Sequence, residues 1–426
     1  MRFKILRLLG ISMFVSLITF AGMNYANGQT RISSPFSRFG VGELMFNNNF
    51  RNLGMGGLGV GYRSNISVNS VNPASYTAVD STSFIFEATG FSHFYHAQTA
   101  TQSQVGNFTS LSALSFSFPI THWWATAAGV KPFSAMGYKV RNHIVDPTFG
   151  HIDFLYEGSG GINQVFWGNA FRPLPGFSVG VNASYMFGNL TRSASVSSDS
   201  IGFFLTNQVK AHKISGWHFG LGAQYEHIFS ENRYITLGII YGLETAISSE
   251  QSETIRRRLP GVTPFDTTLF RVADQGNFIL PMYWGVGITG RINEQWKAGF
   301  EFQWQNWENY SLNNQNDNLV NTYRYAVGVR FRPTPRTFGG FFTRLEYSAG
   351  FRFAQNYLNI NNQPQNEFGI SFGAYMPIRR TKNGINLGVE FGQRGSTENN
   401  LIQENLFRIN LGVNIHERWF IRTRFF

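Results

Sequence analysis

The sequence predicts an all-β fold: a 14-stranded antiparallel transmembrane β-barrel with an N-terminal plug in its lumen. From residue 83 onward, aromatic or aliphatic residues alternate with small or polar ones, in runs of about the ~9–11 residues that a tilted strand needs to cross a bilayer. Aromatic residues make up 16% of the chain and charged residues only 14%, as expected when outward faces meet lipid. The small, polar inner face argues for a water-lined barrel rather than a β-sandwich with an apolar core.

The N-terminus has the features of a secretory signal peptide at residues 1–28. Arg2, Lys4 and Arg7 form a basic start, and an uncharged apolar run follows from Leu8 to Met23. Ala26-Asn27-Gly28 offers the small residues that a signal peptidase reads, so we expect cleavage after Gly28 and export of the chain.

A plug is expected at residues 29–81, before the strands begin. Its glycines Gly54, Gly56 and Gly57 allow the backbone to run close to the lumen wall, and Asn72-Pro73-Ala74 ends its polar middle part. A nucleotide-binding loop is excluded here, because the glycines have no Lys-Ser/Thr partner and no βαβ setting.

The barrel is expected at residues 82–415. In Phe177–Gly188 and again in Trp296–Gln305, apolar side chains occupy one face and Gly, Ser, Asn, Gln or Glu the other. Six short turns alternate with seven longer polar connections, among them residues 141–150, 193–207 and 250–276. This gives 14 strands with both ends on the short-turn side, the periplasmic side of such barrels. We take Phe407–Ile415 as the last strand and residues 416–426 as a short basic periplasmic tail.

Strand parity places charged side chains in the lumen. They form either a ladder that anchors the plug or guides a carboxylate head-group, or a network in which buried charges satisfy one another. These residues are Glu301, Arg330, Arg344, Glu346, Arg352, Glu390, Arg394 and Arg408.

Composition argues against several function classes. The chain has no Cys, which excludes disulfides and thiolate metal sites, and His93 and His96 point to opposite strand faces, so we expect no metal and no cofactor. Removing the signal leaves 32 Lys and Arg against 24 Asp and Glu, scattered singly rather than clustered, which does not suit nucleic acid. Strand serines without a recognisable base or acid do not indicate an enzyme, although an esterase barrel stays possible in principle.

These residues together resemble a known family. The signal peptide, Met55-Gly56-Gly57, Asn72-Pro73-Ala74 and about 14 strands are similar to the long-chain fatty-acid transporter family of outer-membrane proteins, and Ser34–Gly40 resembles its Bacteroidetes version. The resemblance implies a lumenal hatch at Asn72, Pro73 and Ala74, and a third strand whose kink opens the wall sideways.

The third strand is expected to start near Trp123 and to contain Gly129, Pro132 and Gly137. Proline removes a ladder donor and glycine bends a strand, so this is the expected place for a defect in the wall.

The resemblance implies outer-membrane transport of hydrophobic, fatty-acid-like molecules with lateral release into the surrounding lipid. The alternative is a non-transporting barrel subunit of a secretion or outer-membrane assembly complex, with a protein partner in that membrane. A third possibility, a passive porin, requires the plug to leave an open path.

Overall fold

The structure, a computed structural model, describes residues 34–45, 51–198, 200, 202–258, 266–334, 340–378 and 381–419. The expected signal peptide and residues 420–426 of the expected tail lie outside these ranges. Across the described residues, no helix is long and apolar enough to cross a membrane.

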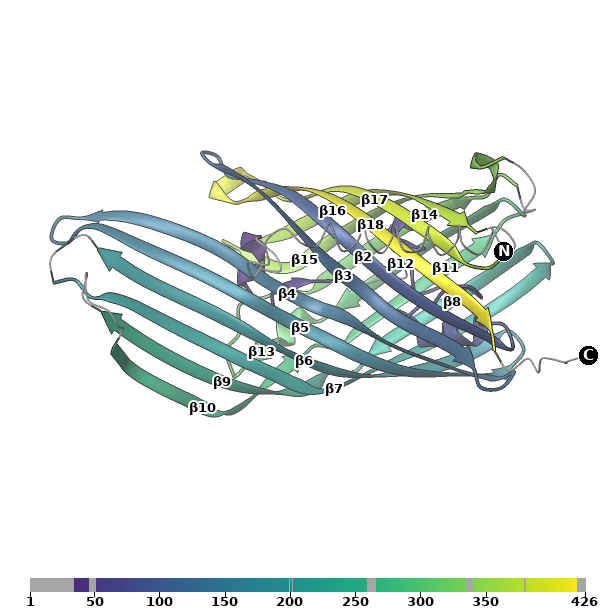
Figure 1. Ribbon diagram of the computed structural model, residues 1–426, viewed down its shortest axis with the longest axis horizontal. Helices are drawn as coiled ribbons and strands as arrows, with labels where there is room; N and C mark the ends of the chain where they lie inside the picture. The colour runs from purple at the N-terminus through teal and green to yellow at the C-terminus, as the bar shows by residue number, and fades with distance from the viewer. Residues whose placement is uncertain are drawn as a thin grey trace, which may run out of the picture. The chain divides into compact units, whose positions relative to one another are not determined.

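A closed antiparallel barrel dominates the fold (Figure 1). Eighteen labelled strands form one sheet, and the last pairs with β2 to close it. Two of them, β1 (Glu43–Leu44) and β13 (Ser311–Leu312), are two-residue segments beside the wall. Four others form two consecutive pairs, and each pair crosses the wall once with a break of two residues in the middle. That leaves 14 crossings and confirms the fold predicted from the sequence. The wall strands are β2 Ser83–Gln98, β3 Ser103–Pro119, β4 Trp124–Asp146, β5 Gly150–Leu174, β6 Phe177–Ser198, β7 Leu205–Ser230, β8 Arg233–Gly242 with β9 Thr245–Arg258, β10 Asp266–Leu280 with β11 Tyr283–Arg291, β12 Trp296–Gln305, β14 Thr322–Phe331, β15 Glu346–Ile360, β16 Gln363–Pro377, β17 Gly384–Gly395 and β18 Gln403–Arg418.

The alternation predicted from the sequence sets the inner and outer faces. In β6, Ser178, Asn182 and Ser184 are buried in the lumen, whereas Tyr185 and Phe187 are exposed on the outer surface. In a membrane the outer aromatic side chains would contact lipid, so their exposure in the isolated chain is expected and not unfavourable.

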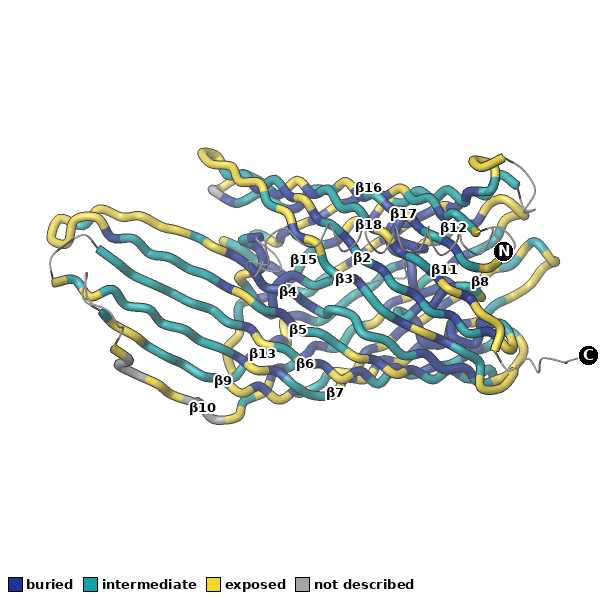
Figure 2. Tube along the Cα trace, in the orientation of Figure 1, coloured by how far each residue is buried: buried dark blue, intermediate teal, exposed yellow. Residues whose placement is uncertain are grey.

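Several strands are much longer than a bilayer crossing requires. β4, β5, β6 and β7 contain 23, 25, 22 and 26 residues. With β9 and β10 they continue beyond the rest of the wall as a sheet, here called the extension (Figure 1). Figure 2 shows buried residues concentrated in the barrel itself, whereas the extension is mostly intermediate or exposed.

The extension is formed largely by segments that were expected from the sequence to be loops, and this expectation was wrong. Residues 141–150, 193–207 and 250–276 were expected as long loops, but strand pairing continues through most of them. A sheet surrounded by water needs no apolar outer face, so polar segments such as Ser193–Ser198 keep the backbone ladder without the alternating pattern. At the other end, β18 continues to Arg418, beyond the expected last strand residue Ile415.

The plug consists of short segments inside the lumen. These are η1 (Pro35–Arg38), β1, η2 (Leu53–Met55) and η3 (Pro73–Ala78). At the long-loop end, plug residues Phe36 and Val41 join Trp307, Tyr310 and Tyr357 in the largest buried apolar cluster. The core of this protein therefore lies in the lumen, between plug, wall and the loop that carries η4 (Trp307–Asn309).

Candidate functional site: the plug and the wall seam

The Asn72-Pro73-Ala74 segment docks on the wall at β6, β7 and β8. Asn72 caps η3, because its side-chain oxygen accepts from the Ala74 amide at 3.1 Å, and Pro73 starts the helix. The Asn72 amide donates to the carbonyls of Val60 at 2.8 Å, Ala223 at 3.2 Å and Ile239 at 3.3 Å. One asparagine thus joins two parts of the plug to two wall strands.

Glycines on both sides allow this close approach. Gly56 and Gly57 have φ angles of 69° and 75°, a backbone region that favours glycine. On the wall, a Cβ on Gly350 would overlap the Gly56 nitrogen, and a Cβ on Gly328 would overlap the Met55 carbonyl. A Cβ on Gly54 would collide with the Ser348 hydroxyl.

Buried charges hold the middle of the plug. Glu301 of β12 accepts from the amides of Gly59 at 2.6 Å and Val60 at 3.0 Å, and it pairs with Arg324 of β14. Arg324 also donates to the Gly56 carbonyl at 2.8 Å. The plug backbone therefore supplies hydrogen bonds that this buried ion pair needs.

A second group of contacts lies toward the short-turn end. Arg330 donates to the Arg51 carbonyl at 2.6 Å and to the Tyr62 hydroxyl at 2.9 Å. Arg51 in turn forms an ion pair with Glu346.

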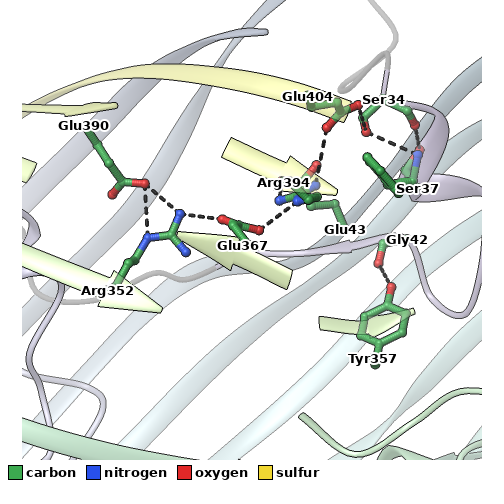
Figure 3. Close-up of polar contacts among 11 residues, drawn as sticks. Ser34, Ser37, Gly42, Glu43, Arg352, Tyr357, Glu367, Glu390, Arg394 and Glu404 are labelled. Atoms are coloured by element: carbon green, nitrogen blue, oxygen red, sulfur yellow. Dashed lines mark hydrogen bonds and ion pairs between the residues drawn. The ribbon is translucent and has the colours of Figure 1, made fainter. Parts of the chain in front are cut away.

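An ionic network connects plug strand β1 to the wall on the opposite side (Figure 3). Glu43 pairs with Arg394 of β17 at 2.9 Å, and Arg394 pairs with Glu367 of β16 at 2.7 Å. Arg352 of β15 continues the network to Glu367 at 2.5 Å and Glu390 at 2.7 Å. These residues come from four strands, so the network fixes β1 against three neighbouring wall strands at once.

The wall has a seam between β3 and β4. Their pairing covers only Leu114–Pro119 of β3 and Ala125–Val130 of β4, whereas β4 continues to Asp146 paired with β5. Just past the last β3 pair, the β4–β5 register shifts between Pro132 and Ser134. We use "seam" for this part of β4, from Lys131 onward, which has left β3.

Plug strand β1 occupies the beginning of the seam. Glu43 and Leu44 pair antiparallel with Ala135 and Ser134 of β4, and the Met45 amide donates to the Phe133 carbonyl at 2.9 Å. The plug thereby replaces β3 as the pairing partner of β4.

Of the three residues expected at a kink, Gly129 lies just before the seam, and Pro132 and Gly137 lie within it. Gly129 lies in the last paired stretch, where a Cβ would collide with the Leu114 carbonyl of β3. Pro132 lies at the register shift. Gly137 exchanges hydrogen bonds with the Ser37 hydroxyl of the plug, at 2.9 and 3.1 Å.

A cavity of about 200 Å³ lies between the plug and the wall next to the seam. Lys131 of the seam lines it, donates to the Ser70 hydroxyl at 2.9 Å, and lies 5.6 Å from the ring centroid of Phe166. The other lining residues mix apolar and polar groups: Leu44, Met45, Val71, Phe133, Gln164, Asn182, Ser184, His218, Gly220, Ile240, Leu280, Tyr283, Gln303 and Gln305.

Most of the charged residues expected in the lumen lie there, and Arg344 is the exception. Arg408 stacks on the Phe91 ring at 5.6 Å to the centroid. Arg344 is instead in the turn helix η5 (Phe342–Arg344), since β15 begins only at Glu346, and it donates to the Gly340 carbonyl. Arg324 and Glu367 were not anticipated, although Arg324 shares strand parity with Arg330.

Comparison with known proteins decides the family. The model of the family described as BamG matches residues 10–426. The chain belongs to the BamG family. No curated protein matches this member of the family.

Solved structures share the fold of this BamG-family chain at low sequence identity. The Pseudomonas putida toluene transporter TodX is 14% identical with a TM-score of 0.58, over 92% of this chain and 100% of its own. A Pseudomonas aeruginosa FadL homologue is 12% identical with a TM-score of 0.58, over 88% and 98%. The CymD monoaromatic hydrocarbon channel is 12% identical with a TM-score of 0.56, over 89% and 99%.

Proposed function

We propose that this chain lets hydrophobic small molecules cross the bacterial outer membrane and releases them sideways through the seam between β3 and β4. The observation that carries the proposal is the early end of β3–β4 pairing at Val130. Unpaired backbone is costly next to lipid, so a wall strand that loses its neighbour is a feature to explain. The shared fold with a toluene transporter and a monoaromatic hydrocarbon channel supports the same function.

The cavity beside the seam is the proposed cargo site. Leu44, Met45 and Phe133 give it an apolar side toward the seam, and Lys131 provides a cation for a carboxylate. A volume of about 200 Å³ suits a small ring or part of an acyl chain, so a fatty-acid-like cargo would occupy it only in part.

A reversible staple tests lateral release. Leu44 and Ser134 are register partners next to the hydrogen-bonded Met45–Phe133 pair, so their Cβ atoms are suited to a disulfide, and the chain has no other cysteine. We expect the oxidised Leu44→Cys/Ser134→Cys variant to lose uptake of a labelled fatty acid or toluene, and reductant to restore it. Each single variant is the control. Undiminished uptake by the stapled protein would exclude movement of β1 away from the seam.

A second candidate is a non-transporting subunit of a secretion or outer-membrane assembly complex. Membership in the BamG family and the extension favour it, because strands of 22–26 residues project well beyond the ~9–11 residues that cross a bilayer and offer a large surface for a partner. Native mass spectrometry of the barrel from its own membrane in mild detergent separates the two candidates. A monomer with an apolar ligand supports transport, whereas a stoichiometric protein partner and an empty lumen support the subunit role.

A further inference from the structure

A second cavity, of about 440 Å³, opens at the short-turn end of the lumen. Plug residues Arg51, Tyr62 and Arg63 line one side of it. Wall strands and two turns, at Glu231 and Glu294, line the rest. It differs from the cavity at the seam in both position and lining, and the lateral release proposed above does not pass through it.

Positive charge is in excess around this cavity. Seven basic residues line it against four acidic ones. Two of the acidic residues, Glu231 and Glu294, are exposed in the turns. Glu346 is shared between Arg51 and Arg332, and Glu226 lies 4.0 Å from Arg63. The basic residues are Arg51, Arg63, Arg172, Arg291, Lys297, Arg330 and Arg332.

Lys297 is the clearest case of a cation without a carboxylate. Its side chain is buried, with 9% of the residue exposed. The Nζ atom lies 4.3 Å from the ring centroid of Tyr62 and 5.5 Å from that of Tyr234, and it donates to the Arg63 carbonyl at 3.3 Å. In the described part of the chain, no ion pair joins Lys297 or Arg330 to an acidic side chain.

The unbalanced charge also acts on Tyr62. Burial alone would raise the pKa of this phenol, but Arg330, Arg51 and Lys297 together lower it to about 7. A site that stabilises a phenolate in this way provides a field that would also stabilise an anion from solution.

We propose that this cavity binds an anion that carries a phosphate group. Arginine guanidinium groups bind phosphate oxygens in pairs, and a doubly charged anion offsets most of the excess of three cations. The cavity opens at the end of the barrel that faces the periplasm if the short turns do, so the ligand would come from a soluble pool as free phosphate or as a phosphate monoester.

The test is a titration of the purified full chain in a non-ionic detergent at constant ionic strength, with inorganic phosphate in one arm and glycerol phosphate in the other. Calorimetry measures the Kd. We expect saturable binding in at least one arm, and the tighter arm identifies the free ion or the monoester. Chloride at equal ionic strength should give no saturable heat. Equal heats from chloride and phosphate would show only general screening of the positive charges by salt, and would overturn the proposal.

Two variants locate the site. Lys297→Gln and Arg291→Gln should each weaken phosphate binding about tenfold or more, the loss expected for one charge-assisted contact. Arg344→Gln is the matched control, since Arg344 is at the same end but does not line the cavity. Arg291 contacts the Tyr234 ring rather than the plug, so its variant reports on the site even if Lys297→Gln fails to fold. Equal affinity in Arg291→Gln and Arg344→Gln would place binding elsewhere and refute the proposed site.

Phosphate binding should also move the titration of Tyr62. A bound anion beside Arg330 and Lys297 offsets their charge and raises the pKa of the phenol above its value in the free protein. A shift of the tyrosinate absorbance to higher pH on adding phosphate supports the site, and an unchanged titration in the presence of saturable binding contradicts its position.

Discussion

Tyr62 illustrates how a single plug residue responds to the wall around it. Its hydroxyl accepts from Arg330 at 2.9 Å, and its ring lies beneath Lys297. Three cations lower the pKa of the phenol from 10.0 to about 7, although burial acts in the opposite direction. Tyr62 therefore changes charge near neutral pH, unlike an exposed tyrosine.

The pH dependence of Tyr62 follows from this lowered pKa. Because the folded-state pKa is below the unfolded one, ionisation contributes stability that is fully present above pH 10 and is lost as the pH falls through about 7. We expect a tyrosinate absorbance step near neutral pH that disappears in Tyr62→Phe. A Tyr310→Phe variant, altered in a tyrosine far from these cations, should keep the step. Titration of wild-type absorbance only near pH 10 would contradict the expectation.

At the scale of elements, the contact between plug and wall depends on where side chains are missing. Gly350 and Gly328 of the wall lie against the backbone of Met55 and Gly56, so β14 and β15 form a surface onto which η2 fits closely. A methyl group there has no space, because the atoms it would meet are backbone atoms of the plug.

Gly350→Ala should therefore destabilise the protein by about 1–3 kcal/mol, the usual cost of overpacking. Gly388→Ala is the matched control, since Gly388 also lies in a wall strand and the nearest atom to its Cβ would be 3.8 Å away, an ordinary contact. Thermal unfolding in detergent checks both. Equal midpoints for the two variants would mean that the plug does not press on the wall at Gly350.

The alternation of residues was enough to predict the barrel and its 14 crossings, because lipid imposes an apolar outer face on every strand it touches. Strand residues that do not contact lipid need no such alternation. For this reason the segments Ser193–Ser198 and 250–276 of the extension were expected to be loops. The break at Pro281–Met282 between β10 and β11 also has no signature in the alternation.

The site could be predicted only in part. Strand parity placed Glu301, Arg330 and Glu390 in the lumen, but parity gives a face and not a partner. Glu43 pairs with Arg394, which is 351 residues away in the sequence, and no local pattern encodes such a pair. The pairing of β1 with the seam has the same origin, because a two-residue strand is too short to produce a periodic signal.

For the whole molecule, the contents of the lumen determine whether it conducts ions. The plug is held by Glu301 and Arg324, by Arg330, and by the Glu43–Arg394 network. Breaking one partner of a buried ion pair costs about 3–5 kcal/mol, so the plug should stay in place at rest.

We therefore expect little current from the wild-type protein in planar bilayers. The Arg324→Ala/Arg330→Ala variant should produce frequent openings, since it removes two anchors of the plug. Arg344→Ala, which removes a cation of the turn at the same end, should behave like the wild type. A large steady conductance of the unmodified protein would instead support a passive porin.

The fit between β1, the seam and the ionic network also has a consequence for the order of assembly. β1 pairs with β4 on one side and connects through Glu43 and its ionic network to β15, β16 and β17 on the other, and wall glycines leave no clearance around η2. A plug that entered a finished barrel would have to form both sets of contacts at once, deep inside the lumen. We therefore expect the wall to form around the plug, with the plug serving as the template on which the third strand and strands β15 to β17 meet.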